Sequence, residues 1–237
     1  MQWNDEGILL SARPYGENAL LVHLLTAEHG RHGGLVPGGQ GRRNRPLWQI
    51  GNRLQVHWQA RLAEHLGTVS GDLVTAHAAR HLADPDRLVA LGAACALAEL
   101  CFPERELQPG AFAALTTLLD SLHEEFWPSL YVHWECGLLG SLGFGLDLSQ
   151  CAATGGTRDL VFVSPKTGRA VSREAGDAWR DKLLPLPGFL REGGAGSSAE
   201  VSAGLRLTGH FLEHHVLAAQ GRSMPAARSR LVERLRA

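Results

Sequence analysis

Residues 53–61 read Arg-Leu-Gln-Val-His-Trp-Gln-Ala-Arg, so that every second residue is apolar. An alternation with a period of two is typical of a β-strand that has one face buried and the other in solvent. The apolar face carries Trp58, and the polar face bears a cationic residue at each end, Arg53 and Arg61. We therefore predict a half-buried strand here, with Trp58 in the core.

Short apolar runs on both sides of this segment predict further strands. Clusters of turn-forming residues separate them, as in Arg13-Pro14-Tyr15-Gly16-Glu17-Asn18 and Glu28-His29-Gly30. The runs are Ile8–Leu10, Ala19–Leu25, Arg31–Val36 and His65–Val69. Five short strands in about seventy residues suit a small closed β-barrel of the oligonucleotide-binding type, the OB-fold, and other small barrels fit as well.

A glycine- and arginine-rich segment lies between the third and fourth predicted strands: Gly38-Gly39-Gln40-Gly41-Arg42-Arg43-Asn44-Arg45, here named the arginine loop. Glycine lets the backbone approach a ligand closely, and neighbouring guanidinium groups face either solvent or an anion. Two interpretations stay open on these residues, a solvated hairpin tip and a mobile phosphate-binding loop. A P-loop would end in Lys-Ser or Lys-Thr, and a dinucleotide site would place its glycines at the start of a helix. The arginine loop has neither feature.

Beyond residue 80 the hydrophobic period changes to that of amphipathic helices. Asp84-Pro85 predicts a helix start, and apolar residues then recur at steps of three and four. Helices are expected at 84–102, 109–126, 128–142 and 203–219, with a last one from Pro225. Residues 143–176 break this pattern with glycines, a short apolar run at Leu160–Val163 and a turn, which indicates a small strand-containing insertion. The expected fold class is α+β, with a barrel domain at 1–80 and a mainly helical domain at 81–237.

Composition and charge indicate a soluble globular protein with localised binding faces. Of the 237 residues, 44% are apolar and 20% charged, and the net charge is -1. This charge is uneven: +2 over residues 1–83, -6 over 84–127 and +3 over 128–237. The first residues resemble no export leader and no apolar run is long enough for a bilayer, so we expect a cytoplasmic location.

No motif in the sequence demands catalysis. His210 and His214 have the i, i+4 spacing of a zinc pair, but their order relative to Glu213 does not match the His-Glu-x-x-His motif of zinc proteases. Cys95 lies on a predicted buried helix face, where packing is its expected role. The four cysteines do not suggest a disulfide scaffold. We expect neither an enzyme nor a cofactor, and a hydrolase using these histidines or the arginine loop stays as an alternative.

Several motifs, in their order along the chain, resemble the RecO family of bacterial recombination mediators. They are Asp5-Glu6-Gly7-Ile8-Leu9-Leu10, Tyr15-Gly16-Glu17, Leu25-Thr26, His29-Gly30-Arg31, the arginine loop, Leu138-Leu139, Leu142-Gly143-Phe144-Gly145, Leu148 to Cys151, and Phe162-Val163-Ser164-Pro165-Lys166-Thr167-Gly168. Together they cover most of residues 1–190. The resemblance implies an N-terminal OB-fold joined to a helical domain, with no nucleotide hydrolysis.

The same resemblance implies DNA as a ligand and two protein partners. Members of the family bind single- and double-stranded DNA, anneal complementary strands, and act with RecR to load RecA onto DNA covered by single-strand-binding protein. They contact the acidic C-terminal tail of that last protein. A non-DNA-binding protein adaptor is the main alternative, and the sequence does not locate the partner-binding groove.

The insertion departs from the family pattern at a zinc site. Some members carry a zinc knuckle of two Cys-x-x-Cys pairs in this region. Here the pairs read Cys151-Ala152-Ala153-Thr154 and Ser172-Arg173-Glu174-Ala175, so one thiolate of four remains. We predict a degenerate, zinc-knuckle-like insertion without zinc.

Within the barrel domain, we expect arginine side chains to contact the sugar-phosphate backbone irrespective of base sequence. The candidate DNA-binding residues are Arg31, Arg42, Arg43, Arg45, Arg53 and Arg61. Tyr15 or Trp48, in or beside loops, is a candidate for stacking on bases. The last helix adds Arg228, Arg230, Arg234 and Arg236, whose role on the sequence alone is either a solvated face or a second phosphate surface.

Overall fold

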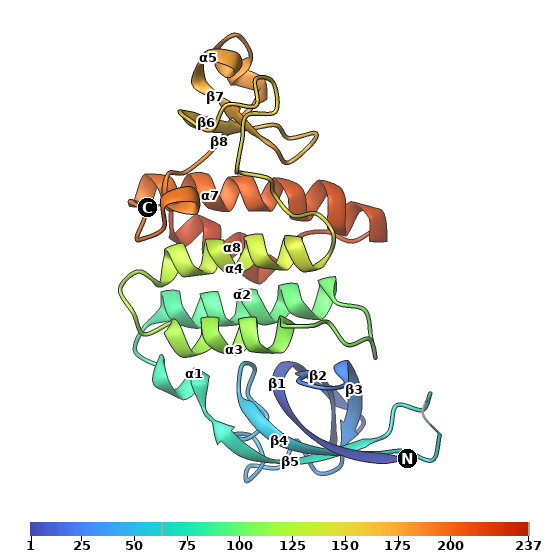
Figure 1. Ribbon diagram of the computed structural model, residues 1–237. Helices are drawn as coiled ribbons and strands as arrows, with labels where there is room; N and C mark the ends of the chain where they lie inside the picture. The colour runs from blue at the N-terminus through green and yellow to red at the C-terminus, as the bar shows by residue number, and fades with distance from the viewer. Residues whose placement is uncertain (63, 237) are drawn as a thin grey trace. The chain divides into compact units, whose positions relative to one another are not determined.

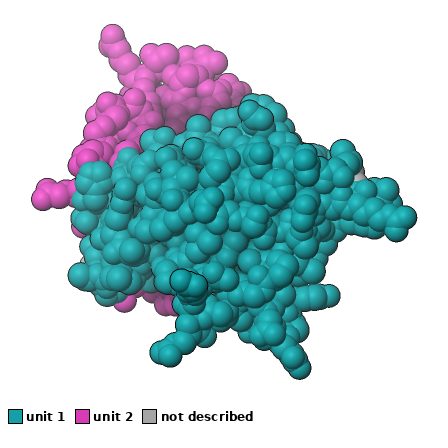
Figure 2. All heavy atoms as spheres, turned by 90° about the horizontal axis from the view of Figure 1, so that it is seen from below, with its two compact units in different colours: residues 1–123, 225–228 teal, residues 124–224, 229–237 magenta. Residues whose placement is uncertain are grey.

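A computed structural model describes residues 1–62 and 64–236 of the chain. The chain forms two compact units, coloured separately in Figure 2. Unit 1 comprises Met1–His123 with Pro225–Arg228, and unit 2 comprises Glu124–Met224 with Ser229–Ala237.

Five strands of unit 1 close into a barrel in the order β1-β2-β3-β5-β4 (Figure 1). Neighbouring strands pair antiparallel, except for β3 and β5, which are parallel. The strands are β1 (Gln2–Tyr15), β2 (Ala19–Thr26), β3 (Gly30–Val36), β4 (Arg53–Gln59) and β5 (Thr68–Thr75). β1 is long enough to pair with β2 along one edge and with β4 along the other, which allows the sheet to close.

The interior of the barrel follows from the alternation along β4. Leu54, Val56 and Trp58 are at most 2% exposed, whereas the residues between them face outward. This confirms the predicted half-buried strand and the core position of Trp58. Trp48 also lies in this core and is 6% exposed, although its place beside a loop had suggested a base-stacking role. The stacking interpretation of Trp48 is therefore wrong.

The fifth strand lies further along the chain than its apolar run predicts. We expected a strand at His65–Val69, but β5 begins at Thr68. Gly67 has a φ of +73°, a left-handed conformation that ends the preceding loop, and a Cβ there would lie 2.6 Å from the Trp58 ring. Gly67 therefore packs against the Trp58 ring in a conformation that a strand does not adopt, and the strand begins at the next residue.

Helices α1 (His77–Arg80), α2 (Pro85–Cys101) and α3 (Ala111–Ser121) complete the main body of unit 1. Asp84 caps α2 as predicted, because its side chain accepts hydrogen bonds from the N–H groups of Asp86 and Arg87. Cys95 is buried within α2. The helix α3 ends five residues before the expected Phe126. The strand-to-helix change falls between Thr75 and His77, and the division into domains 1–80 and 81–237 stays a prediction.

A partly buried carboxylate joins α2 to the barrel. Glu99 accepts a hydrogen bond of 2.7 Å from the Ser11 hydroxyl and lies 3.0 Å from His23 Nδ1 and 3.4 Å from the Arg13 guanidinium. Burial alone would raise the pKa of Glu99, but the bonds from His23 and Ser11 and the charge of Arg13 lower it below its usual value. The carboxylate therefore stays ionised and holds the outer faces of β1 and β2 against the helix.

Unit 2 consists of helices and a small sheet. The longest helices, α4 (Trp127–Ser141) and α7 (Ser198–Phe211), pack against each other (Figure 1). The sheet has the order β7-β6-β8 and contains β6 (Leu160–Val163), β7 (Ala170–Ser172) and β8 (Leu184–Pro185). The other elements are α5 (Arg173–Gly176), the 3₁₀ helix η1 (Asp177–Lys182), α6 (Phe189–Glu192), the π-helix η2 (Leu212–Leu217) and the 3₁₀ helix η3 (Ala218–Gln220). The last helix, α8 (Ala226–Arg234), is divided between the units, because its residues up to Arg228 belong to unit 1. The predicted strand in the insertion is confirmed, but β8 carries the sheet beyond the expected limit at residue 176.

Hydrogen bonds surround Cys151, the one cysteine among residues 143–176. The Ser172 N–H lies 3.3 Å from Cys151 Sγ, and the Ser172 hydroxyl lies 3.5 Å from the same sulfur. Burial would raise the pKa of Cys151, but hydrogen bonds from Ser172 and Thr154 lower it to about 6. Within residues 1–62 and 64–236, no three His, Cys, Asp or Glu residues gather in a group able to hold a metal ion.

Two buried histidines in unit 1 predict a loss of stability in acid. His32 and His77 are 7% and 0% exposed, neither ring has a hydrogen-bond partner among the described residues, and burial lowers each pKa from 6.5 to about 4. The folded pKa lies below the unfolded one, so their stabilisation is complete above pH 6.5 and is lost as pH falls toward 4. At pH 5 each histidine should cost about 2 kcal/mol of unfolding free energy.

Urea unfolding at pH 7 and pH 5 measures this effect. Because carboxylates titrate over the same range, the informative quantity is the difference between the parent protein and a His77→Gln variant, which cannot take up the proton. We expect the pH-dependent drop to be smaller by about 2 kcal/mol in the variant. An equal drop in both proteins would contradict a suppressed pKa at His77.

The helices of the described residues include none that is both long enough and apolar enough to cross a membrane.

Candidate nucleic-acid interface

The connection between β3 and β4 starts with the arginine loop, whose backbone is folded into successive hydrogen-bonded turns. Gly38 has a φ of +66°, which favours glycine, and the Gly41 N–H donates to the Gly38 carbonyl at 3.1 Å. The N–H groups of Asn44 and Arg45 both donate to the Gly41 carbonyl. Since these amides are used within the loop, they do not form a phosphate cradle. The side chains of the loop are therefore its main candidates for ligand contacts.

Two amide side chains fasten the arginine loop to the barrel and to itself. Gln40 Nε2 donates to the carbonyls of Gly16 and Ala19, at 3.1 and 2.9 Å, in the turn between β1 and β2. Asn44 Nδ2 donates to the Gly38 carbonyl at 2.9 Å and closes the loop on itself. The arginine loop is thus anchored by specific bonds, in contrast with the mobile loop expected from its glycines. Sequence reasoning had assigned these amides no role.

The remainder of the connection, residues 46–52, runs to the start of β4. Trp48 enters the barrel core, and the buried Asn52 donates through Nδ2 to the carbonyls of Pro46 and Leu47. With the segment held on both sides, Arg42, Arg43 and Arg45 are exposed. None of the three forms a salt bridge with any residue in the described ranges. Their positive charges are therefore available to an external anion.

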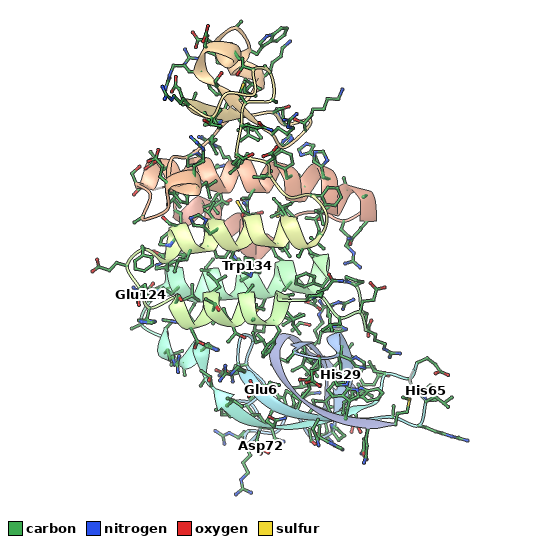
Figure 3. All side chains as sticks on the ribbon, viewed as in Figure 1. Glu6, His29, His65, Asp72, Glu124 and Trp134 are labelled. Atoms are coloured by element: carbon green, nitrogen blue, oxygen red, sulfur yellow. The ribbon has the colours of Figure 1, made fainter. Side chains whose placement is uncertain are left out.

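The other three predicted arginines differ from these and from one another. Arg31 is only 12% exposed, its Nε donates to the Phe102 carbonyl at 2.8 Å, and its guanidinium lies 3.9 Å from Glu104. Arg53 lies 3.6 Å from the Glu6 carboxylate, and Figure 3 labels Glu6 on the barrel. Arg61 is exposed and has no salt bridge within residues 1–62 and 64–236. The structure thus separates four available guanidinium groups from two that serve contacts inside unit 1.

Three loops meet where β3 ends. Leu20 of β2 pairs with Val36, so the turn between β1 and β2 adjoins this point. On the other side, Leu35 pairs with Thr68, and its N–H donates to the Gly67 carbonyl at 3.0 Å. The arginine loop leaves β3 directly after these residues. The end of the loop between β4 and β5, at Gly67, therefore lies beside the point where the arginine loop begins. Figure 3 labels His65 on this loop.

Tyr15 stands at the end of β1, next to the turn that Gln40 holds, and is 53% exposed. It is thus a candidate for stacking on an unpaired base beside the arginine loop.

The remaining sequence candidates lie outside the barrel. His210 and His214 stack with their ring centroids 4.4 Å apart, and His214 Nδ1 lies 3.0 Å from the His210 carbonyl, so this nitrogen is directed at the backbone. In α8 and its end, Arg228 is 6% exposed, whereas Arg230, Arg234 and Arg236 are exposed. Because Arg228 is buried, only the other three arginines could contribute to a phosphate-binding surface.

Comparison with known proteins finds two family models along the chain. A family model described as Recombination protein O N terminal matches residues 1–77, and one described as Recombination protein O C terminal matches residues 82–224. Similar full-length relatives are the DNA repair protein RecO of Rhodospirillum centenum, 53% identical and covering 100% of this chain and 95% of the relative, and that of Rhodospirillum rubrum, 52% identical and covering 100% and 97%. The DNA repair protein RecO of Jannaschia sp. is 47% identical over 99% of this chain and 96% of its own length. On these matches over nearly its whole length, the chain belongs to the RecO family of DNA repair proteins.

Proposed function

We propose that this protein is a recombination mediator without enzymatic activity that binds single- and double-stranded DNA through phosphate contacts. The observation that carries the proposal is the group of exposed arginines in an anchored loop, Arg42, Arg43 and Arg45, without an internal ion pair among the described residues. Arg61, in the loop between β4 and β5, supplies a fourth exposed guanidinium group. We leave Arg31 and Arg53 out of this interface, because their guanidinium groups already contact Phe102 and Glu6.

The strand order of the barrel supports an oligonucleotide-binding role. We propose that β1 to β5 act as an OB-fold, with the connections at the end of β3 as its nucleic-acid surface. Guanidinium groups that hold phosphates leave the base edges of a strand free. Strand annealing follows from this geometry, because a second strand can pair with bases that the protein does not cover.

The same proposal includes the partners of a mediator. We propose that the protein acts in the cytoplasm with RecR, contacts the C-terminal tail of single-strand-binding protein, and helps load RecA onto DNA that this protein covers. Membership of the family and the similar full-length relatives support this assignment.

Fluorescence anisotropy with labelled oligonucleotides of unrelated sequence tests DNA binding. Four phosphate contacts predict that log affinity falls linearly with log salt, with a slope of about -3 on single strands and about -4 on duplex DNA. Affinity should depend little on base sequence, because counterion release does not report base identity. A protein that binds neither oligonucleotide at low salt would instead be an adaptor. Release of phosphate from nucleotides by the pure protein would favour the hydrolase alternative.

A further inference from the structure

The barrel also has a hollow at the C-terminal end of β4. The connection that contains the arginine loop joins β4 at the other end of this strand. This open hollow of about 550 Å³ is bounded by the first residues of β1, the last residues of β4 and the loop that leads to β5. Its lining includes Gln2, Gln59, Arg61, His65, Gly67 and Thr68. Its volume is in the range of small-molecule binding sites.

The floor of the hollow follows from the strand register. Gln59 lies opposite Gln2 on one side and opposite Thr68 on the other, so the three side chains form a row on one face of the sheet. In the next row, Trp58 lies opposite Val69 and packs into the barrel core. Because successive side chains alternate, the row of Gln59 faces outward. It presents two carboxamides and one hydroxyl, which can both donate and accept hydrogen bonds.

The wall of the hollow is held in place from three directions. Trp58 Nε1 donates to the Leu66 carbonyl at 3.0 Å, and the Leu35 N–H donates to the Gly67 carbonyl at the same distance. Arg105, from the segment after α2, donates through Nη2 to the His65 carbonyl at 2.9 Å. The wall is thus fixed before any ligand enters, which lowers the entropic cost of binding.

The charge of the hollow favours an anionic ligand. Arg61 is exposed and makes no salt bridge in the described part of the chain, and the lining contains no Asp or Glu. Gly67 and Thr68 of the lining adjoin Leu35, directly before the residues from which the arginine loop departs. A chain of phosphates that contacts the arginine loop can therefore continue toward Arg61.

We propose that this hollow receives one unstacked nucleotide of single-stranded DNA. Gln2, Gln59 and Thr68 hydrogen-bond the exposed edge of its base, and Arg61 contacts its phosphate. The assignment rests on the proposed function and adds a preference to it. In a duplex the base edges are paired and stacked, so a nucleotide would first have to leave the helix, at a cost in free energy. The hollow therefore favours single strands over duplex DNA.

Two substitutions test this site in the full-length protein. Gln59→Glu keeps the size of the side chain but places a negative charge on the floor, and Arg61→Ala removes the phosphate contact. We expect Gln59→Glu to weaken binding of a labelled oligothymidine about 10-fold and to change duplex affinity less than about 2-fold. Arg61→Ala should weaken oligothymidine binding about 10-fold and duplex binding as well, because it removes one of the four proposed phosphate contacts. Gln55→Glu is the control, because it makes the same change on the same strand, four residues from Gln59 and outside the lining. It also removes the hydrogen bond that Gln55 Nε2 donates to the Asp5 carbonyl, so its stability is measured alongside.

The outcomes separate this inference from the proposed function. Equal losses of Gln59→Glu on single-stranded and duplex DNA, or a Gln59→Glu variant that behaves like Gln55→Glu, would overturn the nucleotide site and leave DNA binding intact. Absence of DNA binding by the parent protein would overturn both. Far-ultraviolet circular dichroism and thermal melting of each variant check that it is folded, and Arg61→Lys, which retains the charge, should recover most of the single-strand affinity lost in Arg61→Ala.

Discussion

Simultaneous replacement of Arg42, Arg43 and Arg45 by alanine is expected to lower the affinity for single-stranded DNA about 100-fold at roughly 50 mM salt. These side chains are exposed, and no acidic group in the described residues neutralises them. On a single strand, each phosphate contact accounts for the release of about 0.7 counterions. Without three contacts, the slope of log affinity against log salt concentration should become shallower by about two. Duplex affinity should fall as well, since phosphates are common to both forms.

Stability should change little in this variant. The three guanidinium groups take no part in the bonds that hold the arginine loop, which come from Gln40, Asn44 and the backbone. Anisotropy titrations over a range of salt concentrations measure both affinity and slope, and thermal melting confirms the fold.

A matched triple variant removes the same charge from arginines that already have carboxylate partners. Arg13 pairs with Glu99, Arg80 with Asp120 and Arg87 with Asp84, at 3.4, 3.4 and 3.1 Å. Replacing Arg13, Arg80 and Arg87 by alanine should reduce affinity less than about 5-fold, through the change in net charge alone. If both triple variants lose affinity equally, binding depends on overall charge and the arginine loop is not the interface.

The sequence predicts the barrel better than it predicts the interface. Strand periodicity is a local property, and the alternation around Trp58 is strong enough to place β4 correctly. The availability of an arginine depends instead on residues that are distant in sequence. Arg31 donates to the carbonyl of Phe102, 71 positions away, and no local pattern around Arg31 indicates this bond. Only the structure could therefore separate Arg31 from Arg43.

Loops show the same limit in another way. Glycines and arginines between two strands predict an exposed loop, and Arg42, Arg43 and Arg45 are exposed. Nothing local indicates that Trp48 would enter the barrel, because its environment is formed by residues of other strands. The strand β8 was missed for a similar reason, since two residues carry no periodicity and Leu184 is fixed by its pairing with Val163.

Gly30→Ala is expected to destabilise unit 1 by about 4 kcal/mol, the largest effect of a single substitution that we predict. Gly30 has a φ of +67°, and a Cβ at this position would lie 2.0 Å from the backbone carbonyl oxygen of Glu106. A backbone atom cannot move aside as a side-chain end does. The segment after α2 must therefore shift, which breaks the 2.7 Å bond from the Arg105 N–H to the Arg31 carbonyl. In thermal melting, the midpoint should fall by roughly 10 °C.

Gly16→Ala is the control that separates backbone strain from the clash at Gly30. Gly16 has a φ of +60°, close to that of Gly30, but nothing lies within 4 Å of a Cβ built there. Its substitution should cost only the left-handed strain, about 1 kcal/mol. Because Arg105 also holds the His65 carbonyl, Gly30→Ala should displace the wall of the hollow and weaken single-strand binding even where the variant stays folded. Similar melting midpoints for the two variants would show that the segment after α2 does not press on Gly30, and the link from this glycine to the hollow would be wrong.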